Sequence, residues 1–313
     1  MRVLVTGATG FAGRWLIVEL EASGHAAIPA PPSDRLDLST EGSAERILEE
    51  SHPDAIAHLA AVSFGPDARR DPARAMAVNV EATRRLIDAA GRLQPPPLVL
   101  VAGSSEVYGN PSPALLPLRE DAPLRPVHPY GQSKLEQERV AVDAGSVSRV
   151  PVVVSRAFNH TGPGQRAEFV APALARRVLE ARDAGANTIR VGNIDVRRDI
   201  GDVRDTVRAY RLLLEGLASG RVSPGSVLNV ATDHSVSIRE ILTTLCTIAG
   251  ASVEPVQDPS LVRDDDPPEI VGSAARLTEL TGWRPAIPME RTLADLMASL
   301  DTGLATGARL EGP

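Results

Sequence analysis

The chain has 313 residues, a hydrophobic content of 43% and a formal net charge of -7, which fit one large α/β domain or a main domain with a smaller lobe. The negative charge excludes the basic surface of a nucleic-acid-binding protein and argues against an anionic membrane as partner. The single cysteine, Cys246, excludes an internal disulfide. No apolar run approaches the roughly 18 residues of a membrane span, and no cleavable signal precedes the first strand, so we expect a cytoplasmic protein.

Short apolar runs alternate with helical stretches in the first half of the chain. Strands are predicted at 3–5, 55–60, 98–102 and 150–155, and apolar spacing predicts a helix at 74–93. Repeated strand and helix pairs indicate βαβ units with right-handed crossovers. Aromatic residues make up only 3% of the chain, so the core is aliphatic, which suits strands buried on both faces. The predicted fold is α/β, with a Rossmann-type doubly wound parallel sheet.

After about residue 160 this alternation loosens. Helices are predicted at 166–184, 203–218, 236–249 and 289–300, separated by Pro- and Gly-rich joints. We assign residues 1–160, with a contribution from 201–235, to a dinucleotide-binding domain. Residues 161–200 and 236–313 are assigned to a smaller C-terminal substrate-binding lobe. The acidic run Asp264 to Asp266 is expected in a solvated loop, and the tail from Thr302 has no periodicity.

A glycine-rich motif, TGATGFAG at residues 6–13, follows the first strand and opens a helix. Glycines there let the backbone turn tightly and approach a pyrophosphate, while helix N–H groups point at its charge. The order of strand, loop and helix predicts a dinucleotide site. Its predicted cofactor-binding residues are Gly7, Thr9, Gly10, Phe11, Ala12 and Gly13, joined by Asp37 and Leu38 near the adenine and by Ala60 and Ala61, whose small side chains leave room for the dinucleotide.

The end of the second strand leaves the choice of dinucleotide open. In this fold an acid near residues 29–33 binds the ribose of NAD, and an arginine accommodates the 2'-phosphate of NADP. Neither stands at the expected position, although Asp34 and Arg35 lie nearby and favour opposite choices. We therefore predict NADP or NAD as cofactor, and no metal.

The motif YGQSK places Tyr130 and Lys134 four residues apart, on one face of a helix. A phenol has a pKa of about 10, and a nearby ammonium is expected to lower the pKa of Tyr130. Ser104, after strand 98–102, can bind the oxygen that gains or loses a proton. These three residues suit hydride transfer between a carbonyl and an alcohol. Glu106 is either a catalytic base or a ligand for a sugar hydroxyl.

The second half of the chain supplies candidate substrate contacts. Asn159 and His160 follow a predicted strand, where ligand contacts are common in an open sheet. The turn 162–164 has N–H groups suited to phosphate. Arg198 is expected to point inwards, towards a diphosphate. Three further arginines have helical spacing and are expected on a solvated helix face: Arg204, Arg208 and Arg211.

Five motifs together resemble the extended short-chain dehydrogenase/reductase family over nearly the whole chain: TGATGFAG, HLAA at 58–61, AVNVEAT at 77–83, YGQSK, and TGWRP at 281–285. The resemblance implies NAD(P)-dependent chemistry on nucleotide-linked sugars. It also places Asn79, Tyr130 and Lys134 at the cofactor. A homodimer built on helices 74–93 and 129–142 is implied as well.

Two stretches resemble the GDP-mannose branch of that family, and most of all its GDP-4-keto-6-deoxy-D-mannose reductases: NHTGPGQ at 159–165 and VGNIDVRRDIGDVRD at 191–205. The resemblance predicts NAD(P)H-dependent reduction of the C4 ketone of a GDP-4-keto-6-deoxy-hexose, giving GDP-D-rhamnose or its C4 epimer. It implies that the GDP-linked sugar is contacted by Ser105, Glu106, Asn159, Arg198, Arg263 and Glu269.

Three other functions stay open. A GDP-mannose 4,6-dehydratase would use Glu106 to remove the C5 proton, and a nucleotide-sugar 4-epimerase shares the hydride chemistry. A non-catalytic dinucleotide sensor would have no physical need for Ser104, Tyr130 and Lys134. The loop TGPGQ stands where dehydratases carry a more basic loop, segment 29–37 lacks their arginine clamp, and the chain is shorter than theirs. These features favour the reductase.

Overall fold

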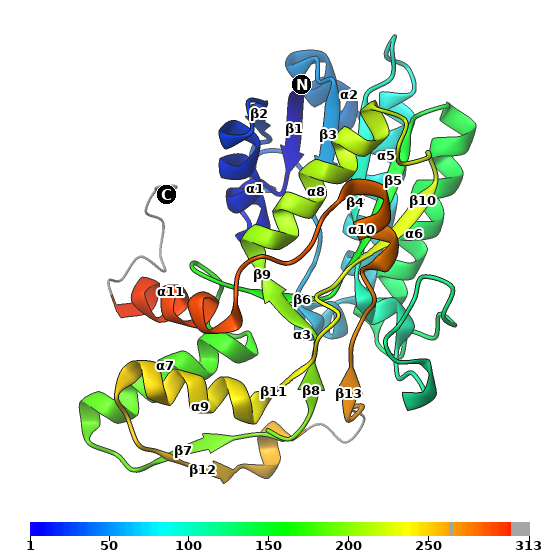
Figure 1. Ribbon diagram of the computed structural model, residues 1–313. Coiled ribbons are helices and arrows are strands. Elements are labelled where there is room, and N and C mark those ends of the chain that lie inside the picture. The colour runs from blue at the N-terminus through cyan, green and yellow to red at the C-terminus, as the bar shows by residue number, and fades with distance from the viewer. Residues whose placement is uncertain (263–265, 302–313) are drawn as a thin grey trace.

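A six-stranded parallel sheet forms the centre of the computed structural model, which describes residues 1–262 and 266–301 (Figure 1). Its strands are β1 (Arg2–Thr6), β2 (Ala26–Pro29), β3 (Ala55–His58), β4 (Leu98–Ala102), β5 (Val152–Ala157) and β10 (Ser226–Val230), in the spatial order β10-β5-β4-β3-β1-β2. Because β1 pairs with β2 on one side and β3 on the other, the strand order reverses there and a crevice opens beyond its carboxyl end. The predicted doubly wound α/β fold is confirmed.

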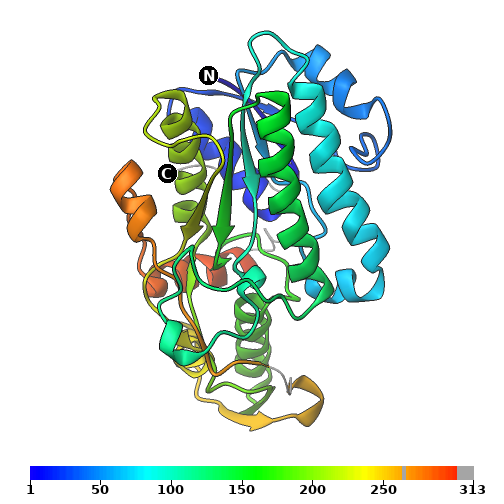
Figure 2. The same cartoon turned by 90° about the vertical axis from the view of Figure 1, so that its right-hand side faces the viewer.

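Helices cover both faces of this sheet (Figure 2). α1 (Phe11–Ala22) and α8 (Val203–Ala218) pack on one face, and α2 (Ser43–Ser51), α5 (Ala82–Ala90) and α6 (Pro129–Ser148) pack on the other. Within β1, Val3 and Val5 join the first core and Leu4 joins the second. Burial on both faces explains why the strands are continuous apolar runs.

A smaller lobe lies below the carboxyl ends of the strands in Figure 1. Its core is formed by α7 (Val170–Ala184), α9 (Ile238–Ala249) and α11 (Met289–Asp301). Short strands pair around it: β6 (Asn159–Thr161) with β9 (Ile200–Asp202), β7 (Thr188–Val191) with β12 (Glu254–Gln257), and β8 (Arg197–Arg198) with β11 (Val236–Ser237) and β13 (Glu269–Ile270). The remaining elements are α3 (Gly65–Arg70), α4 (Pro72–Met76), α10 (Ala275–Thr281), the π-helix η1 (Ala77–Glu81) and the 3₁₀ helices η2 (Ser105–Tyr108), η3 (Pro113–Leu115) and η4 (Pro259–Leu261).

Residues 274–283 pack within the large lobe, although the predicted boundary assigned them to the smaller one. Ala274, Leu277 and Trp283 belong to the core around α1 and α8. The indole of Trp283 is fixed there because its Nε1 donates to Asp205 O at 2.9 Å. The division of the chain into two domains otherwise stays a prediction.

The predicted helix 74–93 is interrupted and ends earlier. It begins at Pro72 as α4, passes through the π-helix η1 and ends at Ala90 as α5. A π turn inserts one extra residue into a helix, often near a functional site. Here it carries Asn79, whose side chain accepts from Val62 N at 2.8 Å and donates to Val62 O at 3.2 Å. This contact joins segments distant in sequence, so helical spacing alone does not reveal the break.

The connection between α6 and β5 also differs from the prediction. α6 runs to Ser148 instead of ending near 142, and Arg149 closes it in the left-handed conformation, with φ at 58°. Pro151 follows and has no N–H to donate to the sheet. β5 therefore begins at Val152, two residues later than predicted.

Two helices of the smaller lobe begin later than predicted. α7 begins at Val170 instead of 166, after a loop that contacts the opposite lobe. α9 begins at Ile238 instead of 236, because Ser237 and Glu240 form a capping box at its first turn. α8 matches its predicted bounds of 203–218.

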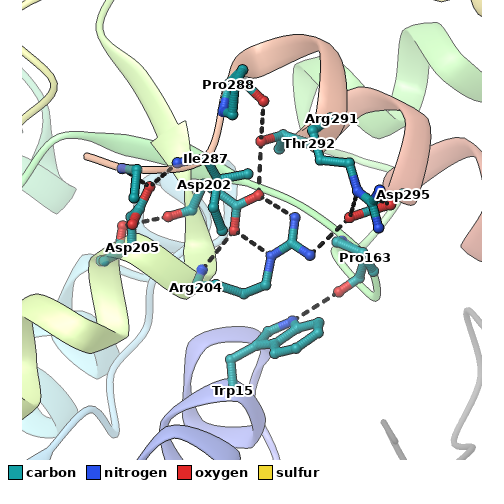
Figure 3. A network of polar contacts seen from close by, with 12 residues as sticks. Trp15, Pro163, Asp202, Arg204, Asp205, Ile287, Pro288, Arg291, Thr292 and Asp295 are labelled. Carbon is teal, nitrogen blue, oxygen red and sulfur yellow. Dashed lines mark hydrogen bonds and ion pairs between the residues drawn. The ribbon is translucent and has the colours of Figure 1, made fainter. Parts of the chain in front are cut away.

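The arginines predicted to lie on a solvated face of α8 instead bind acids on α1, α8 and α11: Arg204, Arg208 and Arg211. Arg204 binds Asp202, the N-cap of α8, at 2.7 Å and Asp295 of α11 at 2.8 Å (Figure 3). Thr292 of α11 also donates to Asp202, at 2.7 Å. Acidic partners from distant segments cover this face, so the prediction was wrong.

The same group of contacts reaches the helix that follows the glycine loop. The guanidinium of Arg204 lies 5.8 Å from the ring centre of Trp15 on α1, and Trp15 Nε1 donates to Pro163 O at 3.0 Å (Figure 3). Arg14 donates to Gly164 O at 3.2 Å. The turn 162–164, expected to offer its N–H groups to phosphate, therefore packs against α1.

Some predictions lie outside the described residues: those for Arg263, for residues 264–265 and for the tail from Thr302. Asp266 is described, and it binds Arg198 at 3.4 Å instead of lying in a purely solvated loop. Cys246 packs half-buried against the core of the smaller lobe. Across residues 1–262 and 266–301, no helix combines the length and apolar character of a membrane span.

Candidate active site

A cleft of about 900 Å³ opens beyond the carboxyl ends of β1, β3, β4 and β5 and continues into the smaller lobe. This is the position at which an open α/β sheet binds its ligands. Most of the predicted site residues line this cleft: Gly7, Thr9, Gly10, Phe11, Ala12, Gly13, Asp37, Leu38, Ala60, Ala61, Ser104, Glu106, Tyr130, Lys134, Asn159 and Arg198.

The glycine loop lines the cleft and is packed so closely against its neighbours that two of its positions have no room for a side chain. Gly7 has φ of 68°, and a Cβ added to it would lie 2.8 Å from Ala60 N. A Cβ on Gly13 would lie 2.1 Å from Gly7 O, so no side chain fits there. α1 begins at Phe11, which directs its N-terminal N–H groups towards this loop. The loop therefore fits the pyrophosphate of a dinucleotide.

The cleft lining includes Asp37 and two cations that the sequence did not predict. Asp37 accepts hydrogen bonds from Ser39 Oγ at 2.6 Å and Ser39 N at 2.9 Å, and these bonds lower the pKa of its carboxyl. Arg69 and Arg74, from α3 and α4, also line the cleft, and the charge of Arg74 lowers the pKa of Asp37 further. They come from the segment after β3, whereas the sequence directed attention to the end of β2.

Ser104 and Tyr130 meet on the cleft wall. The Ser104 hydroxyl lies close enough to the Tyr130 phenol to lower its pKa, and it accepts from Glu106 N at 3.2 Å. Burial raises the pKa of Tyr130, and this effect outweighs that of Ser104; the Glu106 charge raises it further. The expected lowering of this pKa by Lys134 is not seen, so the phenol holds its proton at neutral pH.

Lys134 is buried beside this pair, and burial lowers its pKa to about 7. Its Nζ donates to Ala102 O at 2.9 Å and to Gln137 Oε1 at 2.8 Å, and lies 6.0 Å from the ring centre of Tyr130. Gln137 in turn donates to Thr83 Oγ1 at 2.9 Å. These bonds fix the amine between the end of β4 and α5, facing the cleft.

Asn79, predicted at the cofactor, is buried and does not line the cleft. Besides its two bonds to Val62, its amide donates to Ser133 Oγ on α6 at 2.9 Å. Asn79 therefore fastens the loop after β3 to the helix that carries Tyr130 and Lys134. In the structure Asn79 thus supports the cleft wall, and its predicted contact with the cofactor stays a prediction.

The predicted substrate residues divide into two groups. Asn159, Glu106 and Arg198 line the cleft, whereas Ser105 and Glu269 do not. Glu269 lies opposite Arg197 in the β8–β13 pair and approaches that guanidinium at 3.9 Å. Because neighbouring residues of a strand point to opposite sides, Glu269 follows Arg197 away from the cleft while Arg198 faces it.

Aromatic side chains contribute to the cleft, and apart from Phe11 of the glycine motif none of them was predicted there. All four phenylalanines of the chain line it: Phe11, Phe64, Phe158 and Phe169. Phe64 and Phe169 come from opposite lobes and meet edge to face at 5.3 Å, with the Arg166 guanidinium 5.3 Å from the Phe64 ring centre. The sequence offered one signal for this: aromatic residues are scarce in this chain and its core is aliphatic, so the few phenylalanines could have been expected at a ligand site.

These features define a class of enzyme before any particular relative is considered. A dinucleotide cradle at the switch point of the sheet, beside a proton-donating tyrosine with a serine and a lysine, is the arrangement of an NAD(P)-dependent oxidoreductase of the extended short-chain type. The chain belongs to the NAD dependent epimerase/dehydratase family, whose match covers residues 3–231. The predicted family and the cofactor class, NADP or NAD, are confirmed.

Two curated relatives and one solved structure resemble nearly the full length of the chain. It is 36% identical to GDP-6-deoxy-D-mannose reductase of Pseudomonas aeruginosa, over 96% of this chain and 97% of that protein. It is 30% identical to GDP-6-deoxy-D-talose 4-dehydrogenase of Aggregatibacter actinomycetemcomitans, over 90% and 92%. The structure of RMD from Pseudomonas aeruginosa complexed with NADPH superposes with a TM-score of 0.87 at 35% identity, over 96% of this chain and 99% of that one.

Proposed function

We propose that this protein reduces the C4 ketone of a GDP-4-keto-6-deoxy-hexose to an alcohol, with GDP-6-deoxy-D-mannose, also called GDP-D-rhamnose, as product. The observation that carries the proposal is that Tyr130 and Ser104 line the same cleft as the glycine loop, where burial raises the pKa of the Tyr130 phenol. Reduction of a ketone needs an acid at this point, and a phenol with a raised pKa is in the acid form. The 36% identity to a GDP-6-deoxy-D-mannose reductase supports the choice of sugar.

A nicotinamide dinucleotide held by the glycine loop would supply the hydride for C4 of the sugar. Tyr130 gives its phenolic proton to the ketone oxygen, so that the carbonyl becomes an alcohol. Ser104 holds that oxygen by a hydrogen bond, and Lys134 supports the developing phenolate with its amine. The hydride adds one electron pair and the phenol adds one proton, which balances the reduction.

Cations on the wall of the smaller lobe support a nucleoside diphosphate as the carrier of the sugar. Arg198 and Arg177 line the cleft there, in a chain whose net charge is -7. A local arginine fork is the natural partner of a diphosphate in an acidic protein. Arg69 and Arg74, which line the cleft and come from the segment after β3, support NADPH over NADH, because a 2'-phosphate would bring additional negative charge into the cleft.

Incubation of the purified protein with GDP-4-keto-6-deoxymannose and NADPH is expected to consume one NADPH per ketone. Identification of the sugar formed by NMR is expected to give the rhamnose configuration at C4. A parallel reaction with NADH is expected to proceed more slowly. GDP-mannose with NADP serves as control, and conversion of GDP-mannose without reduction of the keto sugar would overturn the proposal in favour of a dehydratase.

Glu106 keeps the dehydratase as a second candidate, because its side chain lines the cleft beside Tyr130. Elimination of water from C5 and C6 needs a carboxylate base, whereas reduction needs none. Glu106→Gln is therefore expected to retain ketone reduction within about tenfold of the wild type, measured by NADPH oxidation. A fall of about 10³-fold would instead assign Glu106 to proton transfer.

The proposal extends to the assembly and its compartment: a homodimer through helices 74–93 and 129–142, in the cytoplasm. A free and only half-buried Cys246 supports a reducing compartment. The described helices that correspond to this pair are α5 and α6, which pack side by side on one face of the sheet.

A further inference from the structure

A guanidinium buried beneath the cleft connects the segments that carry the catalytic residues. Arg156 lies on β5, with its side chain only 5% exposed. Its Nε and Nη2 donate to the two carboxylate oxygens of Glu138 at 2.9 and 2.7 Å. Nη1 donates to Tyr108 OH at 2.9 Å and to Glu120 O at 2.9 Å. Such a two-pronged pair fixes orientation as well as distance.

Tyr108 completes this buried hub, which consists of Arg156, Glu138 and Tyr108. Its hydroxyl accepts from Arg156 and donates to Asn229 Oδ1 at 2.7 Å, while the guanidinium lies 5.1 Å from its ring centre. Asn229 is itself held, because its side-chain amide donates to Leu118 O at 2.9 Å. The phenol is therefore fixed on both sides, and its ring is 1% exposed.

One arm of the hub leads to Ser104 and Glu106. Tyr108 is the last residue of η2, whose N-cap is Ser104 and whose first turn contains Glu106. A single 3₁₀ turn of this kind has no stability of its own. Its start is fixed by the bond from Glu106 N to Ser104 Oγ, and its end is fixed by Tyr108.

The other arm leads to Tyr130 and Lys134. Glu138 lies four residues beyond Lys134 and eight beyond Tyr130 on α6, so all three share one side of the helix. At the first turn of α6, a Cβ added to Gly131 would lie 2.7 Å from Glu106 O, so helix and loop are in direct backbone contact. The loop η2 and helix α6 are therefore in contact near Glu106 and Gly131, and both are bound to Arg156, through Tyr108 and Glu138.

We propose that the hub of Arg156, Glu138 and Tyr108 is a positioning device that sets Ser104 against Tyr130. Ser104 lies on a short loop and Tyr130 on a helix; both line the cleft, and neither element alone determines the distance between them. A buried ion pair is weak evidence for stability, since apolar residues of similar volume often serve as well. A role in positioning explains why a charged hub is present here. Small displacements of Ser104 relative to Tyr130 would lower the reaction rate, and a two-pronged ion pair prevents them.

The kinetic test is a double-mutant cycle between Tyr108 and Ser104, and it rests on the proposed reduction for its readout. Tyr108→Phe keeps the ring and removes only the bridging hydroxyl. We expect it to lower kcat about tenfold in the wild-type background, with an unchanged dissociation constant for NADPH. In the Ser104→Ala background the same substitution is expected to change kcat less than about twofold, because the group it positions is already absent.

Thr292→Val is the matched control. It also removes a single buried hydroxyl, which donates to Asp202 and to Pro288 O, but at the α8–α11 contact, where no residue of η2 takes part (Figure 3). We expect this control to lower the melting temperature while kcat stays within about twofold of the wild type. Equal losses of kcat from Tyr108→Phe in both backgrounds, or no loss in either, would show that the hub is only structural.

Amide hydrogen exchange tests the same idea without any substrate. Glu106 N and Val107 N donate to Ser104 Oγ and Ser104 O, so their exchange rates report the order of this loop. Tyr108→Phe is expected to speed exchange at both amides, and Thr292→Val is expected to leave them unchanged. Unchanged exchange in Tyr108→Phe would overturn the positioning role. An inactive wild type with faster exchange in the variant would refute the proposed function and keep the hub.

Discussion

Replacing Tyr130 by phenylalanine is expected to lower kcat by about 10²- to 10⁴-fold, the usual range for loss of a general acid. The ring and its packing remain, but the proton for the ketone oxygen is gone. Ser104 keeps its hydroxyl and cannot replace the phenol, because an alcohol gives up its proton far less readily. The measurement is NADPH oxidation under saturating keto sugar, with single-turnover kinetics to isolate the chemical step.

The matched controls for Tyr130→Phe are its fold and its cofactor affinity. Titration with NADPH is expected to give a dissociation constant close to that of the wild type, since the glycine loop is unchanged. The melting temperature is expected to stay close to that of the wild type, because Tyr130 lines the cleft and is only partly buried, so its hydroxyl contributes little to folding. A kcat within about threefold of the wild type would remove Tyr130 from the mechanism.

Arg156→Leu is expected to lower the free energy of unfolding by about 3–5 kcal/mol, because it leaves the Glu138 carboxylate buried without a partner. The two side chains are 5% and 9% exposed, so water cannot replace the guanidinium without opening the structure. Urea unfolding without cofactor measures this loss. The double variant Arg156→Leu, Glu138→Leu is expected to recover most of the stability, since no buried charge then remains.

Arg92→Leu provides the matched control, because the same substitution breaks an ion pair at the surface. Arg92 and Glu45 are 69% and 36% exposed, so this change is expected to cost about 0–1 kcal/mol. Equal losses for Arg156→Leu and Arg92→Leu would mean that Glu138 is neutral or hydrated. In that case the charged hub could not fix the loop and helix as inferred.

Much of the fold was readable from the sequence because its signals are local. Val3, Leu4 and Val5 form a continuous apolar run, and such a run predicts a strand covered on both faces. Helix 203–218 was placed correctly from its spacing alone. Two predictions were wrong because the structure there depends on contacts between distant segments. The helix 74–93 is interrupted by the π turn at Asn79, and the loop before Val170 replaces the predicted first turn of a helix.

The candidate site divides in the same way. The glycine loop and the Tyr130–Lys134 spacing are local patterns, and the structure places both at one cleft. Arg197 and Arg198 are adjacent and chemically identical, and only pairing of β8 with its neighbours turns one towards Glu269 and the other towards the cleft. Arg69 and Arg74 line the cleft because the short helices α3 and α4 pack beside it, and this packing has no local signature in the sequence.

The sequence by itself determined the fold class, the dinucleotide loop and the candidate catalytic residues. Short-range spacing indicates the strands, the helices and the Tyr130–Lys134 pair, and glycines mark the positions where the loop backbone has no room for a side chain. Tertiary structure alone decided how those residues behave. Burial of the Tyr130 phenol keeps it protonated, and burial of Lys134 brings its pKa to about 7, although the two lie only one helical turn apart. Desolvation depends on everything packed around a group, so no spacing along the chain could have shown it.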